Sequence, residues 1–291
     1  RNPARDTLIS QAAKSLGTGF GFAIHEFLDQ IGALIGPLLL AFIFLSFGGA
    51  TQSVADYQFA YSTLWIPFVL LMLVLFIAYF ISKGSLNFEK AERKKETDKL
   101  SSIFWYYVIF TFLTTLGFIN FVIFGYHFKV AGVLADSEIP LFYGAAMIVD
   151  ALFALMIGKM YDVMKVKKKN AASGLLLLIT IPLMTAAIPF LALLQNIYLI
   201  FLGVLLWGAV MGSHETIMRA AIADITPLAK RGTGYGIFTA VYGFAALFGG
   251  IAAGFLYDLS LSALTGFVLI TQVCAVLMFL LMRRKIESRA K

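Results

Sequence analysis

Long apolar runs separated by short polar connections dominate this chain. Eight of the runs are close to the roughly 20 residues that a helix needs to cross a bilayer. Charged residues, Gly or Pro, or a short polar turn bound each run. Since an unpaired backbone polar group is too costly inside lipid, we predict that each run is helical. The predicted spans are residues 18–45, 60–82, 101–126, 138–158, 171–193, 197–218, 234–257 and 262–282.

The composition supports a membrane protein. Hydrophobic residues make up 60% of the chain and charged residues only 13%, whereas soluble domains contain about 25% charged residues. The single cysteine, Cys274, excludes an intrachain disulfide and a cysteine-based metal cluster. The predicted fold class is therefore an all-α polytopic membrane protein.

The basic residues indicate how the chain is oriented. Of the 23 Lys and Arg residues, all except Lys129 lie in alternate connections between the predicted spans. By the positive-inside rule, both ends of this chain are predicted to lie in the cytoplasm, with the spans in the plasma (inner) membrane. The net charge of +7 is then a signal of topology, and no nucleic-acid partner is expected.

One long polar connection divides the spans into two groups. Residues 83–100 mix acidic and basic side chains, which is typical of a solvated linker. We predict residues 1–82 to be part of an N-terminal bundle with two helices, and residues 101–291 to be a C-terminal bundle with six.

A glycine-rich motif occurs twice at the start of a predicted span. LGTGFGF begins at Leu16 and RGTGYGI begins at Arg231, so the shared glycines are 215 residues apart. A basic connection precedes each copy, led by Arg5 in one case and by Arg219 in the other. Two halves related in parallel are a known architecture of secondary transporters.

Two further motifs show which family the chain resembles. The run GKMYDVMKVKKK is similar to the G-x-x-x-D-R-x-G-R-K loop of the major facilitator superfamily, although Val163 and Lys165 replace the Arg and the second Gly. The resemblance implies a cytoplasmic gate loop, and the matching residues include Gly158, Asp162, Lys167 and Lys168.

The second motif resembles a signature of proton-coupled antiporters in that family. GALIGPLLLA matches the pattern G-x-x-x-G-P-x-x-G-G at Gly32, Gly36 and Pro37, and it ends in Leu40 and Ala41 instead of two glycines. Glycines at these positions would let a neighbouring helix approach closely, and a bend at Pro37 could serve gating.

The whole chain resembles this superfamily, which has two halves of six helices. The resemblance implies a helical bundle in which the eight predicted spans are helices 5–12 of twelve, so that four helices would precede residue 1. A protein of eight helices is the alternative. The resemblance also implies a monomeric transporter that moves a small-molecule substrate by alternating access, with protons as the coupling ion and export as the direction.

Polar residues inside the first predicted span are candidates for transport. Charged side chains inside a bilayer are costly and commonly functional. His25 and Asp29 are four residues apart in the stretch HEFLDQ, so they share a helix face with Gly32. Glu26 and Gln30 lie beside that face. These four polar side chains could bind protons or a cation; the alternative is a structural pair between Asp29 and His25, or between Asp29 and a basic residue on one of the helices that would precede residue 1.

Three residues of later spans are also candidates for the cavity. Asp150 has no ionisable neighbour on its own helix, so it must face the cavity, form a hydrogen bond to another helix, or be protonated. Trp207 lies mid-membrane and could line the cavity or pack. His214 could contact protons or substrate, or be packed among apolar neighbours. Glu215 and Arg219, four residues apart, are expected to form an intrahelical salt bridge.

Enzymatic motifs are missing from the sequence. The three histidines, His25, His127 and His214, lack metal-binding spacing, and no phosphate-binding loop is present. We therefore expect a protein that is not an enzyme and that uses no cofactor or metal. The competing functions are a proton-coupled importer or facilitator of the same fold, and a membrane receptor or scaffold that transports nothing.

Overall fold

A computed structural model describes residues 2–13, 15–47, 54–85, 99–134, 138–167 and 171–290. Every regular element in these ranges is a helix. The chain forms two compact units, which we call the main unit (Arg1–Gln30 with Asp98–Lys291) and the small unit (Ile31–Thr97).

The small unit is built from three helical segments. They are the second part of α2 (Thr18–Phe47), then α3 (Val54–Thr63) and α4 (Trp65–Ser85). The predicted span 60–82 falls on α3 and α4, which are separated at Leu64. Most of the predicted charged linker, residues 86–98, lies outside the described residues.

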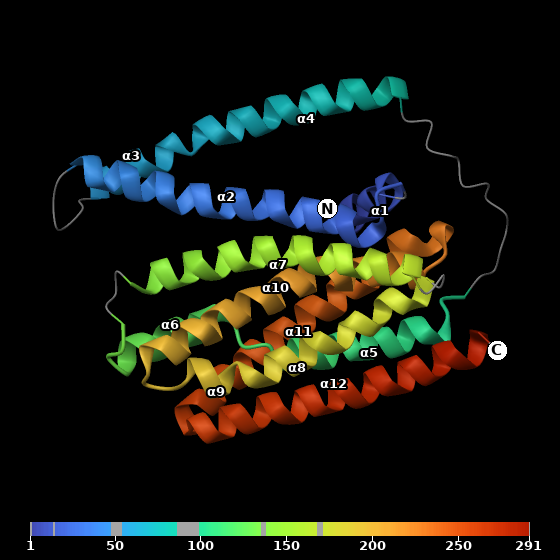
Figure 1. Ribbon diagram of the computed structural model, residues 1–291. Coiled ribbons are helices and arrows are strands. Elements are labelled where there is room, and N and C mark those ends of the chain that lie inside the picture. The colour runs from blue at the N-terminus through green and yellow to red at the C-terminus, as the bar shows by residue number, and fades with distance from the viewer. Residues whose placement is uncertain are drawn as a thin grey trace. The chain divides into compact units, whose positions relative to one another are not determined.

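The main unit contains the other helices, which run lengthwise with connections at alternate ends (Figure 1). They are α1 (Asn2–Ala12), the first part of α2, α5 (Ser102–Leu116), α6 (Phe121–Val130), α7 (Ile139–Lys167), η1 (Ala171–Ile179), α8 (Thr180–Ala187), α9 (Pro189–Ala192), α10 (Ile197–Ile225), η2 (Leu228–Lys230), α11 (Arg231–Leu259) and α12 (Leu261–Ala290).

Seven stretches of the described residues are long and apolar enough to cross a membrane. They are Val54–Ile81, Ser102–Val130, Ile139–Lys167, Ser173–Ala192, Ile197–Ile225, Leu228–Leu259 and Leu261–Ser288. The fold is therefore that of an all-helical membrane protein, as predicted. The predicted span 18–45 corresponds to α2, which is not one of these seven, so the count of eight and the match to helices 5–12 of twelve stay predictions.

Two further predicted spans are interrupted rather than continuous. The predicted helix 101–126 stops at Gly117 and restarts after Asn120, whose side chain accepts a hydrogen bond from the Val122 N–H at 3.0 Å. The predicted helix 171–193 begins as the 3₁₀ helix η1 and continues as α8 and α9, with Pro189 as the first residue of α9. Proline is tolerated in the first turn of a helix because its missing N–H would have no partner there.

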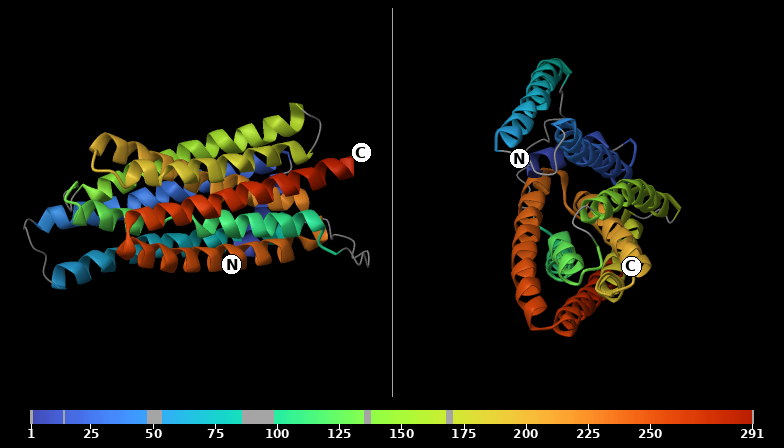
Figure 2. Two further views of the ribbon diagram at one scale, coloured as in Figure 1. Left: turned by 90° about the horizontal axis from the view of Figure 1, so that it is seen from below. Right: turned by 90° about the vertical axis from the view of Figure 1, so that its left-hand side faces the viewer.

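Helix α10 is the most buried helix of the main unit, and it packs along α7. Glycines allow this close packing: a methyl group added at Gly212 would lie 2.6 Å from the Asp150 carbonyl oxygen. Helix α5 packs against both α11 and α12, and the view along the helix axes shows it inside the bundle (Figure 2). We call the end where α7, α10 and α12 finish the basic end, because Lys165, Arg231 and Arg283 lie there.

Candidate functional site

The first copy of the glycine motif lies where α2 crosses α7. A methyl group added at Gly158 would lie 2.6 Å from the Gly19 carbonyl oxygen and 2.7 Å from the Ala23 Cβ. Gly17, just before α2, has a φ of +101°, a left-handed conformation that favours glycine. The two motifs that the sequence singled out, at residues 16–22 and from Gly158, therefore meet at one helix crossing.

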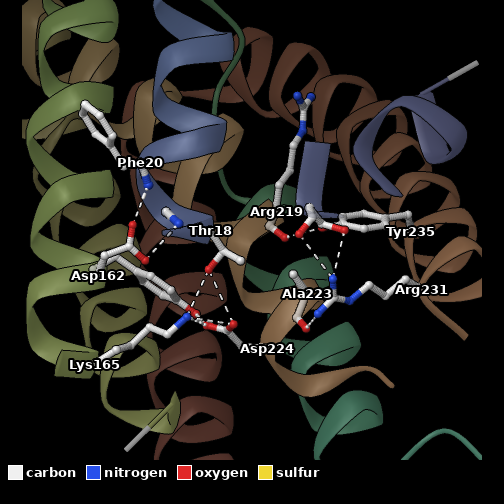
Figure 3. A network of polar contacts seen from close by, with 12 residues as sticks. Thr18, Phe20, Asp162, Lys165, Arg219, Ala223, Asp224, Arg231 and Tyr235 are labelled. Atoms are coloured by element: carbon white, nitrogen blue, oxygen red, sulfur yellow. Dashed lines mark hydrogen bonds and ion pairs between the residues drawn. The ribbon is translucent and has the colours of Figure 1, made fainter. Parts of the chain in front are cut away.

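Asp162 of α7 caps the N-terminus of α2. Its carboxylate accepts hydrogen bonds from the backbone N–H groups of Gly19 at 3.1 Å and Phe20 at 2.7 Å (Figure 3). The first N–H groups of a helix have no partner within the helix, and the helix dipole favours a negative charge there. Asp162 thus satisfies two donors that have no partner within the helix, and it ties α2 to α7.

Removing this cap is expected to destabilise the main unit. Asp162→Ala should lower the free energy of unfolding by about 1–2 kcal/mol, the usual cost of losing a capping side chain. Asp162→Asn should lose less, because its amide oxygen can still accept a hydrogen bond. Thermal unfolding of the purified variants measures the difference. Identical midpoints for the wild type and both variants would contradict a stabilising role for this cap.

A second carboxylate, Asp224 of α10, joins three helices at the basic end. It accepts hydrogen bonds from the Tyr161 hydroxyl at 2.8 Å and from the Thr18 hydroxyl at 3.5 Å. The Lys165 ammonium lies 2.7 Å from the same carboxylate and donates to the Thr18 hydroxyl at 3.1 Å (Figure 3). Asp224 was not a predicted site residue. It lies in the stretch that was predicted to be the connection before the second glycine motif, and this position was the only sequence feature that pointed to it.

Arginines fasten α1 to α10 and α11. Arg219 forms the expected salt bridge with Glu215, and its guanidinium also lies 3.8 Å from the Asp6 carboxylate. Arg231 donates to the Ser10 hydroxyl at 3.2 Å and to the Ala223 carbonyl at 2.8 Å. Residues 1–15 were predicted from the sequence to be a basic connection. Nothing in the sequence indicated that α1 would supply a carboxylate to α10.

Three polar side chains, Glu26, Gln30 and Asp150, form a group that we call the buried polar group. The Gln30 amide donates to the Glu26 carboxyl at 2.7 Å and to the Asp150 carboxyl at 3.0 Å. The three residues are only 3%, 7% and 0% exposed, respectively. One amide nitrogen therefore links a carboxyl group of α2 to a carboxyl group of α7.

The buried polar group has unused hydrogen-bonding capacity. Within the described residues, the second Asp150 oxygen and the Gln30 carbonyl oxygen are buried with no hydrogen-bond partner. Neither Glu26 nor Asp150 forms an ion pair with a described basic residue. For Asp150, the predicted alternative that the structure bears out is a hydrogen bond to another helix, with Gln30 of α2 as the donor. Asp150 does not line either of the two cavities described below.

His25 and Asp29 lie at the edge of this group. The Asp29 side chain is 55% exposed, and its carboxylate lies 3.4 Å from the His25 imidazole and 3.8 Å from the Arg5 guanidinium. Ligand atoms of His25, Glu26 and Asp29 lie within 4.8 Å of one another, which is close enough to hold a metal ion. Of the four polar residues of α2, Asp29 is thus exposed, His25 is half-buried, and Glu26 and Gln30 are buried.

A cavity of about 430 Å³ lies within the main unit, away from the basic end. Trp207 lines it, and the indole N–H donates to the Ile119 carbonyl at 2.8 Å. The lining residues are Thr115, Phe118, Asn120, Phe121, Val122, Tyr143, Trp207, Met211, Tyr242, Ala246 and Gly250.

A smaller cavity of about 140 Å³ is lined by charged residues that include Asp6, Glu215 and Arg219. His214 lines it and contacts the Tyr242 hydroxyl at 3.2 Å through its Nδ1 atom. Because Tyr242 lines both cavities, the pair of His214 and Tyr242 lies between them.

The remaining predicted residues do not join these contacts. A methyl group added at Gly32, in the small unit, would meet no described atom within 4 Å. Gly36 and Pro37 lie within α2, and their surroundings are outside the described part of the structure. Lys167 is exposed at the end of α7, and Lys168 lies outside the described residues. The predicted roles of these residues stay predictions.

Comparisons with known proteins agree with the resemblance found in the sequence. The model of the Major Facilitator Superfamily matches residues 2–212 and residues 134–291. Uncharacterized proteins of Mycobacterium bovis and of two Mycobacterium tuberculosis strains are each 35% identical over 292 residues, which is 97% of this chain and 67% of their own length. No solved structure matches the chain.

Proposed function

Because the chain belongs to the major facilitator superfamily, a family of membrane transporters, we propose that it exports a small molecule in exchange for protons. The observation that carries the proposal is the buried polar group formed by Glu26, Gln30 and Asp150. In this group, the amide of Gln30 donates hydrogen bonds to two buried carboxyl groups that come from different helices.

Protons are the coupling ion that this group suits best. A buried charge without a partner costs on the order of several kcal/mol, and no described basic residue forms an ion pair with Glu26 or Asp150. The neutral, protonated carboxyl avoids that cost, so each carboxyl would bind a proton from water before it is closed off and release that proton when water reaches it again. The half-buried His25 and the exposed Asp29, at the edge of this group, would pass protons between solvent and Glu26.

Proton uptake would be coupled to movement through α2 and α7. Gln30 and Asp150 join these helices at the buried polar group, and Asp162 joins them again at the basic end. Loss of a proton from Asp150 would place a charge between the helices and favour their separation. In alternating access, one bundle rocks against the other, and contacts of this kind would open and close one side.

Topology and direction follow from the sequence. By the positive-inside rule, the basic end would lie in the cytoplasm and the spans in the plasma (inner) membrane. The residues Gly158, Asp162, Lys167 and Lys168 would then belong to a cytoplasmic gate. The antiporter-like signature at Gly32, Gly36 and Pro37 favours export, and we propose that the transporter is a monomer.

Proton movement in proteoliposomes tests this function. The full-length protein is reconstituted with a pH-sensitive dye inside, and a panel of small organic molecules is added outside. An antiporter releases internal protons as substrate enters, so the lumen should become alkaline. Acidification would identify a symporter instead, and substrate uptake with no pH change would identify a facilitator. The absence of both uptake and pH change across the panel would contradict a transporter role.

Matched substitutions test whether the buried carboxyl of α2 carries the coupling. Glu26→Gln keeps a side chain that can bond to Gln30 but cannot release a proton, so substrate addition should no longer change the luminal pH. Asp29→Asn should slow the pH change, since it removes only the accessible carboxylate. Asp258→Asn, at the exposed end of α11, is the control and should behave like the wild type. Full coupling in Glu26→Gln would overturn the assignment of Glu26.

A further inference from the structure

The larger cavity has aromatic walls that face different directions. The Phe121 ring stands at 62° to Trp207 and at 63° to Tyr143, with ring centroids 5.4 and 5.0 Å away. Phe118 stacks on Trp207, with centroids 5.5 Å apart. Tyr242 adds a ring from α11. Rings from several helices thus surround one space of about 430 Å³, within the usual range for drug-sized ligands.

The polar groups of this cavity are few and uncharged. None of its lining residues is Asp, Glu, Lys or Arg. The Trp207 N–H is occupied by the Ile119 carbonyl, so this indole can offer a ligand its ring but not its donor. The Thr115 hydroxyl is buried with no partner among the described residues, and Asn120 also lines the space. Ring faces and a few uncharged hydroxyl and amide groups are therefore the chemistry available to a ligand.

Ring faces distinguish ligands by charge. The face of an aromatic ring is electronegative, so it attracts a cation and disfavours an anion. Quaternary ammonium groups are recognised in this way by aromatic cages. A flat aromatic part of the same ligand would stack between the rings and gain the apolar burial that the cavity offers.

We propose that this cavity binds an organic cation that carries an aromatic ring, and that it is the substrate site of the proposed transporter. The inference rests on the proposed function for its role in transport, but not for the binding itself. The cation would lie among Phe121, Tyr143 and Trp207. The Thr115 hydroxyl is available to a polar substituent.

Three ligands of one shape test the charge preference. Naphthylmethyl-trimethylammonium is the cation, neopentylnaphthalene replaces its nitrogen by carbon, and naphthylmethanesulfonate carries a negative charge. Binding is measured by competition with the radiolabelled cation on the full-length protein in lipid nanodiscs, at equal pH on both sides. The cation should bind about tenfold more tightly than the neutral isostere, since a desolvated cation–π contact has about that effect, and the anion should bind more weakly still. Equal binding of the cation and the neutral ligand, or no binding of any ligand, would overturn the proposal.

A pair of variants shows whether the cavity is the place of binding. Trp207→Phe and Trp207→Leu both lose the hydrogen bond to Ile119, but only the first keeps a ring. The Leu variant should bind the cation about tenfold more weakly than the Phe variant. Equal affinity of the two variants would contradict this placement. Thermal unfolding of both confirms that each is folded, and Tyr143→Phe against Tyr143→Leu gives an independent second comparison if either Trp207 variant is not.

The binding and transport results separate the two proposals. Selective binding of the cation without proton movement would support the cavity assignment and contradict proton-coupled export. Proton-coupled transport of other molecules, without binding of the cation, would support the proposed function and contradict the cavity assignment.

Discussion

Gly158→Leu is expected to separate α2 from α7 and to destabilise the main unit by about 3 kcal/mol, because overpacking costs about 1–3 kcal/mol and loss of a helix cap about 1 kcal/mol more. Even a methyl group at this position would lie 2.6 Å from the Gly19 carbonyl oxygen. That oxygen belongs to the backbone of α2, so the helix itself has to move. The two hydrogen bonds of Asp162 with the first turn of α2 would be lost with that movement.

The same helix supplies a matched control. A methyl group added at Gly144, also in α7, would meet no described atom within 4 Å. Gly144→Leu should therefore be neutral or slightly stabilising, since leucine favours a helix over glycine by up to about 1 kcal/mol. The midpoint of thermal unfolding and the rate of substrate-dependent proton movement are measured for both variants.

The result for Gly158→Leu bears on transport as well as on stability. If α2 and α7 must make this contact in one state of the transport cycle, the variant should lose nearly all proton movement even when it is folded. A Gly158→Leu protein with the same unfolding midpoint and transport rate as Gly144→Leu would show that the close crossing of α2 and α7 contributes neither to stability nor to transport.

Local features of the chain were predictable from the sequence because apolar length and helix boundaries depend on nearby residues. Both glycine motifs were predicted to begin helices, and the structure confirms this at Thr18 for α2 and at Arg231 for α11. The spans on α7 and α10 were also located correctly, although both helices extend beyond the predicted ends by several residues.

Partners from other helices were not predictable because they depend on how the helices pack. Asp150 was identified as a polar residue without a partner on its own helix, but the periodicity of α7 could not show that Gln30 of α2 would be that partner. Asp224 and Asp6 lie in stretches that were predicted to be basic connections, and an acidic residue there gives no sign of a partner on another helix. Helical geometry also placed Asp29 with Glu26, yet only Glu26 is buried.

The two glycine motifs look alike in sequence but differ in their packing. Gly19 of the first copy lies against the backbone of Gly158 in another helix. In the second copy, a methyl group at Gly234 would meet the Thr226 side chain at 3.1 Å, just before its own helix, and one at Gly236 would meet no described atom within 4 Å. The expectation of close packing against a neighbouring helix therefore holds in the main unit for the first copy. Similar motifs can start similar helices while only one forms a tight crossing.

Asp150→Asn is expected to abolish proton-driven transport while leaving exchange of substrate intact. The asparagine oxygen can still accept a hydrogen bond from Gln30, so the link between α2 and α7 is kept, but the side chain cannot bind and release a proton. Uphill accumulation driven by a pH gradient should fall to the level of protein-free vesicles. Counterflow, in which labelled substrate exchanges with unlabelled substrate without a gradient, should continue.

Infrared spectroscopy gives a reading of Asp150 that requires no substrate. The C=O stretching band of a protonated carboxyl group lies at a higher frequency than the bands of carboxylates and amides. Asp150→Asn should lose the part of this band that Asp150 contributes and keep the part from Glu26, whereas the control Asp258→Asn should keep both. Asp150→Leu separates the two roles of the residue: it loses the proton site and the hydrogen bond to Gln30 together, so both uphill transport and counterflow should fail. If Asp150→Asn still accumulates substrate against its gradient, the proton that drives transport does not bind at Asp150, and Glu26 alone would have to carry it.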